Sequence, residues 1–238
     1  MSNSQLVDYT KISPNKTSPR KHAIDTITIH CLVGQCSVET IGDIFSKKSR
    51  KASSNYGIGS DGRIGMYVEE EDRSWCSSNS SNDNRAITIE CASDTTHPYA
   101  INDEVYASLI ELCVDICKRN NIKELKWKAD KALVGKPDEQ NLTVHRWFAN
   151  KECPGDYIYE RLGRIASDVN DRLDANGKVP FAVRVDIDNL NYRSEPSTKG
   201  AIKGQTGKGV FTIVEVSNGW GRLKSGAGWI NLNYATKL

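Results

Sequence analysis

The residues with the clearest chemical potential lie between Asn141 and Gly155. An apolar run ends at His145, and Cys153 follows eight residues later, directly before a Pro-Gly turn. Imidazole and thiolate are ligand types that zinc takes readily. A thiol must lose its proton to bind a metal, and the ammonium group of Lys151, two residues away, favours that loss. Two ligands do not hold a catalytic zinc ion, so such a site would need a third ligand from elsewhere in the chain.

The third candidate ligand is His30, the end of an alternating, β-branched run at 24–31 that predicts a strand. A second run of this type, 85–91, carries Glu90 near its end. Two histidines and one cysteine are the protein ligands of an open zinc site whose fourth position holds water. Each residue also has a purely structural interpretation, a hydrogen-bonded histidine at a strand end or a buried cysteine before a turn.

The elements that must position these residues follow from caps, turns and periodicity. Ser37 and Asn102 are suited to cap helices. Gly57, Gly59 and Gly62 match a dinucleotide-binding glycine pattern, but a strand-like run follows them instead of the required helix, so we exclude that site. The expected elements are a polar extended arm at 1–23, strands at 24–31 and 85–91, a hairpin at 54–68 that turns at Asp61-Gly62, a polar loop at 77–84, and helices at 37–46, 102–120 and 157–173.

Composition limits the class of protein. The chain has 238 residues, 38% of them hydrophobic and 26% charged, with a net charge of +2. These values suit a soluble globular protein and do not favour nucleic acid as a partner. There is no apolar run of about 18 residues that could span a membrane. The N-terminus lacks the basic start and apolar core of a signal peptide. Seven scattered cysteines indicate reduced thiols and synthesis in a cytoplasm.

The chain changes character after about residue 173. Residues 174–181 are rich in turn formers and predict a linker. Beyond it, short β-type runs alternate with glycines, which is typical of a small all-β barrel. Tyr192, Trp220, Trp229 and Tyr234 are expected to line a groove or fill the core of that barrel. From Val179 onward there are 8 Lys/Arg against 4 Asp/Glu, a modest preference for an anionic surface.

Four motifs occur in one order: Ile-Thr-Ile-His30, Ser-Asn-Tyr56-Gly-Ile, Ile-Thr-Ile-Glu90, and the segment from His145 to Lys-Glu-Cys-Pro-Gly155. Over residues 22–173 this combination resembles the zinc-dependent N-acetylmuramoyl-L-alanine amidases of the phage T7 lysozyme and peptidoglycan-recognition-protein family. The resemblance implies an α/β domain with a mixed central β-sheet flanked by helices. It also implies cleavage of the amide between the glycan lactyl group and the L-alanine of the stem peptide.

The resemblance assigns one zinc ion per chain to His30, His145 and Cys153. Some family members have aspartate in place of this cysteine. Zinc can lower the pKa of its bound water to about 7 and polarise the amide carbonyl. Glu90 is then the candidate to take a proton from the water and return one to the leaving amine. The structural alternative for Glu90 is a salt-bridged carboxylate.

Four further residues complete the expected substrate site. Lys151 is suited to stabilising the oxyanion, its alternative being a solvated side chain. Tyr56 is expected to hydrogen-bond the same oxygen or the water. Trp147 and Asn55 are expected to contact substrate, although tryptophan is more often found in a core or at its rim.

The tail is similar to bacterial SH3 domains, which bind cell-wall peptides. We therefore expect an amidase domain at 1–173, a linker at 174–181, and an SH3-like wall-binding domain at 182–238 that binds through Tyr192, Trp220 and Trp229. This combination resembles phage endolysins of Gram-positive hosts, made in the host cytoplasm and acting on bacterial peptidoglycan after release. Two other functions stay open, a peptidoglycan receptor that does not cut and a zinc endopeptidase of the wall peptide.

Overall fold

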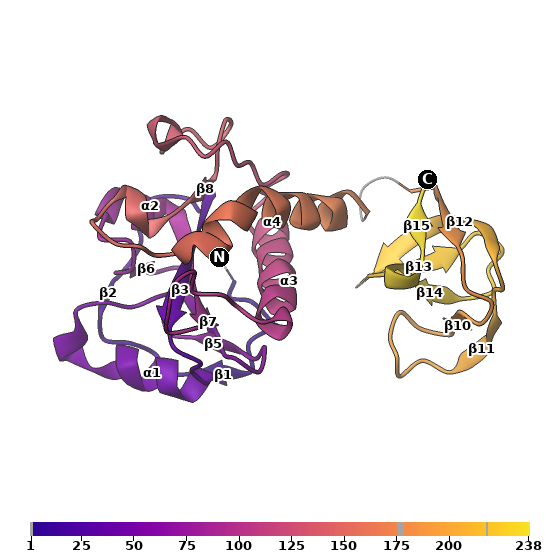
Figure 1. Cartoon of the computed structure of the whole chain (residues 1–238), viewed down its shortest axis with the longest axis horizontal. Helices are drawn as coiled ribbons and strands as arrows, with labels where there is room; N and C mark the ends of the chain where they lie inside the picture. Colours follow the sequence, from indigo (N-terminus) through magenta and orange to yellow (C-terminus); the bar gives the residue numbers. More distant parts are fainter. Residues whose placement is uncertain (1, 176–178, 218) are drawn as a thin grey trace. The chain divides into compact units, whose positions relative to one another are not determined.

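A computed structural model describes residues 2–175, 179–217 and 219–238. The chain forms two compact units, Met1–Asn170 and Asp171–Leu238, which are described separately (Figure 1). The helix expected to end at residue 173 continues to Ala175, and the first strand of the second unit begins at Phe181. Both therefore extend into the segment expected to be a linker, 174–181. Residues 176–178 of that segment lie outside the described residues.

The first unit combines one mixed sheet with helices. Its helices are α1 (Val38–Ser46), α2 (Ser80–Arg85), α3 (Asp103–Arg119) and α4 (Gly155–Ala175), with short 3-10 turns at Lys48–Arg50, Lys131–Leu133 and His145–Trp147. Its strands are β1 (Tyr9–Thr10), β2 (Lys16–Thr17), β3 (Thr26–Val33), β4 (Tyr56–Ile58), β5 (Ile64–Met66), β6 (Arg73–Ser74), β7 (Ala86–Ser93) and β8 (Leu142–Thr143). None of the helices in the described part of the chain is long and apolar enough to cross a membrane.

The main sheet has the strand order β1-β5-β4-β7-β3-β8. β4 and β5 form the expected antiparallel hairpin, whereas β4, β7, β3 and β8 run parallel to one another. The two β-branched runs became the central strands β3 and β7. Their isoleucines, among them Ile29 and Ile89, are fully buried, as expected for strands covered on both faces. The expected mixed α/β sheet is confirmed.

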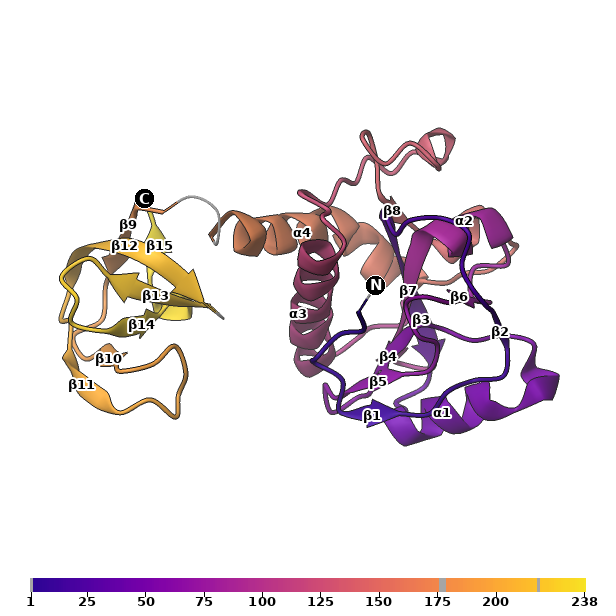
Figure 2. The same cartoon turned by 180° about the vertical axis from the view of Figure 1, so that it is seen from behind.

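The helices begin where capping signals placed them. The Ser37 side chain accepts a hydrogen bond from Thr40 N, and that of Asn102 from Val105 N. α1 lies away from α3 and α4, which run close to each other (Figures 1 and 2). The Tyr106 hydroxyl on α3 donates to the carboxylate of Asp168 on α4, at 2.7 Å.

Two polar segments are more ordered than expected. The loop at 77–84 contains α2, which begins after Asn79, whose side chain accepts from Asn82 N at 2.9 Å. Within the N-terminal arm, β1 pairs in parallel with β5 at the edge of the main sheet, and β2 pairs with β6. Such short segments carry too few residues for a recognisable hydrophobic period, so tertiary contacts decide their conformation.

The second unit is all β. Its strands are β9 (Phe181–Val185), β10 (Asn191–Arg193), β11 (Ile202–Gln205), β12 (Gly209–Ser217), β13 (Trp220–Leu223), β14 (Trp229–Asn231) and β15 (Thr236–Lys237), with a 3-10 turn at Leu232–Tyr234. They form one antiparallel sheet in the order β11-β10-β14-β13-β12-β9-β15. Val183, Val185, Ile213, Leu223 and Ile230 form its buried core. An all-β unit of this kind is compatible with the expected SH3-like module.

Arg20 binds the N-terminal arm to the rest of the first unit through hydrogen bonds. Only 6% of this residue is exposed. Its guanidinium donates to the backbone carbonyls of Glu70 at 2.6 Å, Asp72 at 3.0 Å, Asn84 at 3.0 Å and Ala86 at 3.1 Å. A buried charge is tolerated only when it is hydrogen-bonded in this way.

We expect Arg20→Met to lower the free energy of unfolding by about 3 kcal/mol, because methionine retains the bulk but leaves these buried carbonyls unpaired. Urea denaturation of the full chain measures the change. Lys21→Met, at the exposed neighbouring position, is the matched control and should change stability by less than about 0.5 kcal/mol. Equal shifts in the two variants would contradict the anchoring role.

Candidate metal centre and active-site cleft

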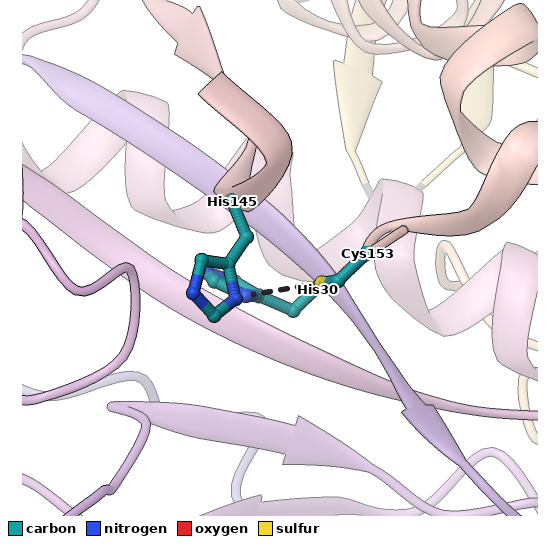
Figure 3. A group of neighbouring side chains, drawn as sticks. All are labelled: His30, His145 and Cys153. Atoms are coloured by element: carbon teal, nitrogen blue, oxygen red, sulfur yellow. Dashed lines mark hydrogen bonds between the residues drawn. The ribbon is translucent and has the colours of Figure 1, made fainter. Parts of the chain in front are cut away.

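Three side chains from separate segments converge in the first unit (Figure 3). His30 lies on β3, His145 begins the 3-10 turn that follows β8, and Cys153 lies in the loop before α4. The Cys153 Sγ lies 3.3 Å from the His30 Nδ1, and the two imidazole ring centres are 5.1 Å apart. One ligand atom from each residue lies within 4.8 Å of the others. The structure thus brings together all three expected ligands.

Strand pairing and a tight loop produce this convergence. β8 pairs in parallel with β3, so that the two strands carry His30 and His145 toward the same end of the sheet. The Arg146 N donates to the Cys153 carbonyl at 3.0 Å and closes the loop between them. Gly155 has a φ of +80°, and a Cβ there would lie 2.7 Å from the Pro98 carbonyl. Only glycine fits this close approach.

The protonation states of the three residues suit a metal. Burial, aided by His145, lowers the pKa of His30 to about 3. Burial also lowers the pKa of His145, and the positive charge of Lys151 lowers it further. Both imidazoles are therefore neutral, the form that binds metal. Burial raises the pKa of the Cys153 thiol, and a divalent cation would offset that cost by stabilising the thiolate. Two nitrogens and one sulfur are a donor set that fits zinc.

Glu90 lies directly beside His30. The parallel register of β3 and β7 pairs these two residues, so their side chains leave the same face of the sheet. The Cys76 thiol donates to Glu90 Oε1 at 3.7 Å. Burial raises the pKa of Glu90 to about 7, a shift that the Cys76 hydrogen bond and the charge of Arg50 oppose.

Two buried polar atoms next to this centre have no partner among the described residues, the Nε2 of His30 and the Oε2 of Glu90. Ligand atoms of His30, Cys76 and Glu90 lie within 4.8 Å of one another. Unpaired buried polar atoms are rare and mark places where a water or an ion is bound. Cys76 was not among the residues expected at the site, because it lies in no periodic element and has no second cysteine at metal-ligand spacing.

Tyr56 lies outside the site, contrary to expectation. In the β4–β7 pair Tyr56 lies opposite Ile89, while Gly57 lies opposite Glu90. Because neighbouring side chains point to opposite faces of a sheet, Tyr56 points away from His30 and Glu90. Its hydroxyl donates to Glu70 at 2.7 Å, and Arg119 donates to the same carboxylate. Tyr56 thus belongs to a buried polar network on the α3 face.

Asn55 and Trp147 are also interior residues rather than substrate contacts. Asn55 is fully buried, and its side-chain amide bonds the backbone of Val68 and Thr88. The ring of Trp147, only 8% exposed, stacks on that of Trp127 with centroids 5.0 Å apart. Both residues lie in or next to a motif in the sequence. Proximity along the chain does not determine the direction in which a side chain points.

A cleft of about 540 Å³ adjoins His145. Lys151, which was expected to stabilise the oxyanion, is one of the residues that line this cleft. The Ser78 hydroxyl lies 3.1 Å from the His145 Nε2, and both Ser78 and Lys51 have a positive φ. Non-glycine residues in that conformation are costly and concentrate at functional sites. The cleft is lined by Arg50, Lys51, Ala52, Arg73, Trp75, Cys76, Ser78, Asn79, Ser80, Asp83, His145 and Lys151.

The second unit has a groove of about 310 Å³. Of the three residues expected to bind the wall, Trp220 lines this groove, together with the exposed Tyr234. Tyr192 packs against the core, and its ring lies close to Gly204. Trp229 is half-buried on β14 and is not among the groove residues.

Solved structures that are similar to the chain include two whose titles name endolysins. A mutant endolysin from Bacillus subtilis matches at 16% identity with a TM-score of 0.51, covering 69% of this chain and 99% of its own. The endolysin N-acetylmuramoyl-L-alanine amidase LysCS from Clostridium intestinale matches at 17% identity with a TM-score of 0.50, covering 71% and 99%. At these identities the likeness establishes the fold. A comparison with curated protein sequences found no match.

The sequence itself matches one family, described as N-acetylmuramoyl-L-alanine amidase, over residues 20–156. The matched segment covers more than half of the chain and contains β3, β7, β8 and all three converging ligands. The chain therefore belongs to the N-acetylmuramoyl-L-alanine amidase family.

Proposed function

We propose that this protein is a zinc-dependent amidase that cleaves the bond between N-acetylmuramic acid and L-alanine in bacterial peptidoglycan. One observation carries the proposal: His30, His145 and Cys153 converge beside the buried carboxyl group of Glu90, at the edge of a cleft. Zinc would be held by these three ligands. A non-cutting receptor would not need this donor set with an acid–base group beside it.

The chemistry follows from the positions of the chain's own groups. A bound zinc ion would polarise the amide carbonyl and make water more acidic. Glu90, next to His30, would take a proton from the attacking water and pass it to the amide nitrogen as the carbon–nitrogen bond breaks. Lys151, at the cleft edge, would stabilise the negative charge that develops on the carbonyl oxygen. The products are a lactyl carboxylate and a free alanine amine.

Removal of the metal or of a ligand should abolish cutting. We expect chelator treatment, His30→Ala and Cys153→Ala each to lower peptidoglycan hydrolysis to background, with activity of the chelated enzyme restored by added zinc. Metal content per chain, measured by mass spectrometry, should fall in both variants. Full lysis by either variant would exclude the zinc assignment.

The end groups released from purified Gram-positive walls separate the amidase from its alternatives. The amidase should release new N-terminal alanine and no new reducing sugar. New amino termini of other residues would indicate an endopeptidase, and no release at all would indicate a receptor.

Glu90 and Tyr56 provide a contrast within one sheet. Glu90→Gln should lower kcat by about 10²–10⁴-fold, because glutamine has a similar shape but cannot accept the proton. Tyr56→Phe should leave kcat within about threefold, since its hydroxyl bonds Glu70 on the opposite face. Its effect should appear in stability, as a loss of about 1–2 kcal/mol. A kcat for Glu90→Gln equal to that of the unmodified chain would remove Glu90 from the mechanism.

We further propose that the all-β unit is an SH3-like wall-binding module. Its groove combines an aromatic floor, Trp220, with an exposed aromatic, Tyr234, and amide side chains such as Asn191. Flat aromatic and amide groups suit a neutral peptide chain. Such a module would hold the enzyme on peptidoglycan after release from the host cytoplasm.

Tyr234→Ala should weaken sedimentation of the full chain with purified walls, about tenfold in apparent Kd, while hydrolysis of a soluble muropeptide stays unchanged. The hydroxyl-bearing ring is 59% exposed, so its removal should not unfold the unit. Leu238→Ala, at an equally exposed apolar residue that does not line the groove, is the control. Equal wall binding by both variants would show that the groove is not where the unit contacts the cell wall.

A further inference from the structure

The cleft beside His145 carries an unusual charge. Four cationic residues line it: Arg50, Lys51, Arg73 and Lys151. None of them forms an ion pair within the described residues. Several arginines elsewhere in the unit form ion pairs, among them Arg63 with Glu39, Arg85 with Asp25 and Arg119 with Glu70. Unpaired cations around one concave surface concentrate positive potential there.

The acidic groups near the cleft do not cancel this charge. Asp83 is the acidic residue in the lining, and it is only 1% exposed. Its carboxylate accepts hydrogen bonds from Cys76 N at 3.1 Å, from Ser77 N at 3.2 Å and from the Ser77 hydroxyl. Glu90 is not among the residues that line the cleft, and its Oε2 is buried. A ligand in the cleft therefore meets cations that are exposed or half-buried and an acid that is already hydrogen-bonded.

A second pocket, about 270 Å³, shares Lys151 with the cleft, but its other charged side chains are of both signs and have partners. Arg146 and His97 both contact the Asp156 carboxylate, at 2.9 and 2.8 Å. The Tyr99 hydroxyl donates to Glu152 at 2.5 Å. Apart from Lys151, which lines both pockets, the charged side chains of this pocket have partners within it, whereas the larger cleft holds three further unpaired cations, Arg50, Lys51 and Arg73.

We propose that the cationic cleft binds the free carboxylates of the stem peptide. The enzyme should therefore prefer peptides in which the carboxyl group of the second residue is ionised rather than amidated. This inference rests on the proposed amidase function. The scissile amide joins a neutral N-acetylated sugar to a peptide, so anionic groups near that bond lie on the peptide side. The second pocket, whose charged side chains other than Lys151 are paired, suits the neutral sugar, and the cationic cleft suits the acidic peptide.

Two soluble muramyl peptides test the preference, identical except that the second residue is D-glutamate or D-isoglutamine. With the full chain, kcat/KM should be about tenfold higher for the free acid at low ionic strength. The ratio should approach one in 1 M salt, where exposed charges are screened beyond about 3 Å. Equal rates on the two peptides at low salt would overturn the inference and leave the amidase function standing. Hydrolysis of neither peptide would overturn the amidase function, and the inference with it.

A charge-matched pair of double variants locates the effect. Arg50→Gln/Lys51→Gln should reduce the ratio to about two or less, mainly through KM. Lys47→Gln/Lys48→Gln removes the same charge from adjacent exposed positions outside the cleft lining and should keep the ratio. Equal melting temperatures establish that both variants fold. The same ratio in both would overturn the proposal. So would a defect of the cleft variant seen only on walls that carry phosphate polymers, because the cleft would then bind those polymers.

Discussion

Side-chain alternation along the parallel pair β3–β7 is the constraint on which the site depends. The register pairs His30 with Glu90, and a slip of one residue would send one of the two to the opposite face. That register is held by isoleucines in the alternate positions, which are fully buried against the rest of the core. The hydrophobic face of the two strands thus determines which polar side chains meet on the other face.

The two faces of the sheet serve different ends. On one face Tyr56, Glu70 and Arg119 form a buried network in which each polar group has a partner, which stabilises the unit. On the other face His30 Nε2 and Glu90 Oε2 lack partners among the described residues, which costs free energy in the protein alone. Polar groups buried in that way are retained where they bind something. This contrast supports placing the chemistry at His30 and Glu90.

The cleft next to this centre is where we propose that substrate is recognised. Lys51 and Ser78 hold left-handed backbone conformations at its wall, and the surrounding cations are left without carboxylate partners in the described part of the chain. The left-handed conformations cost free energy in the folded protein, and residues in such conformations concentrate at functional sites. Their position next to His145 agrees with the proposal that substrate binds in this cleft.

Local signals in the sequence determined the central strands, the capped helices and the change to an all-β tail, since alternation and caps depend on neighbouring residues. Residue chemistry also singled out the three candidate ligands, because few side-chain types bind zinc, whereas Glu90 became a candidate through its place at a strand end and the family resemblance. Only the tertiary structure decided the direction of Tyr56, Asn55 and Trp147, since motif proximity leaves the sheet face open. It alone added Cys76 and the cationic cleft, which join residues distant in the chain and leave no local pattern.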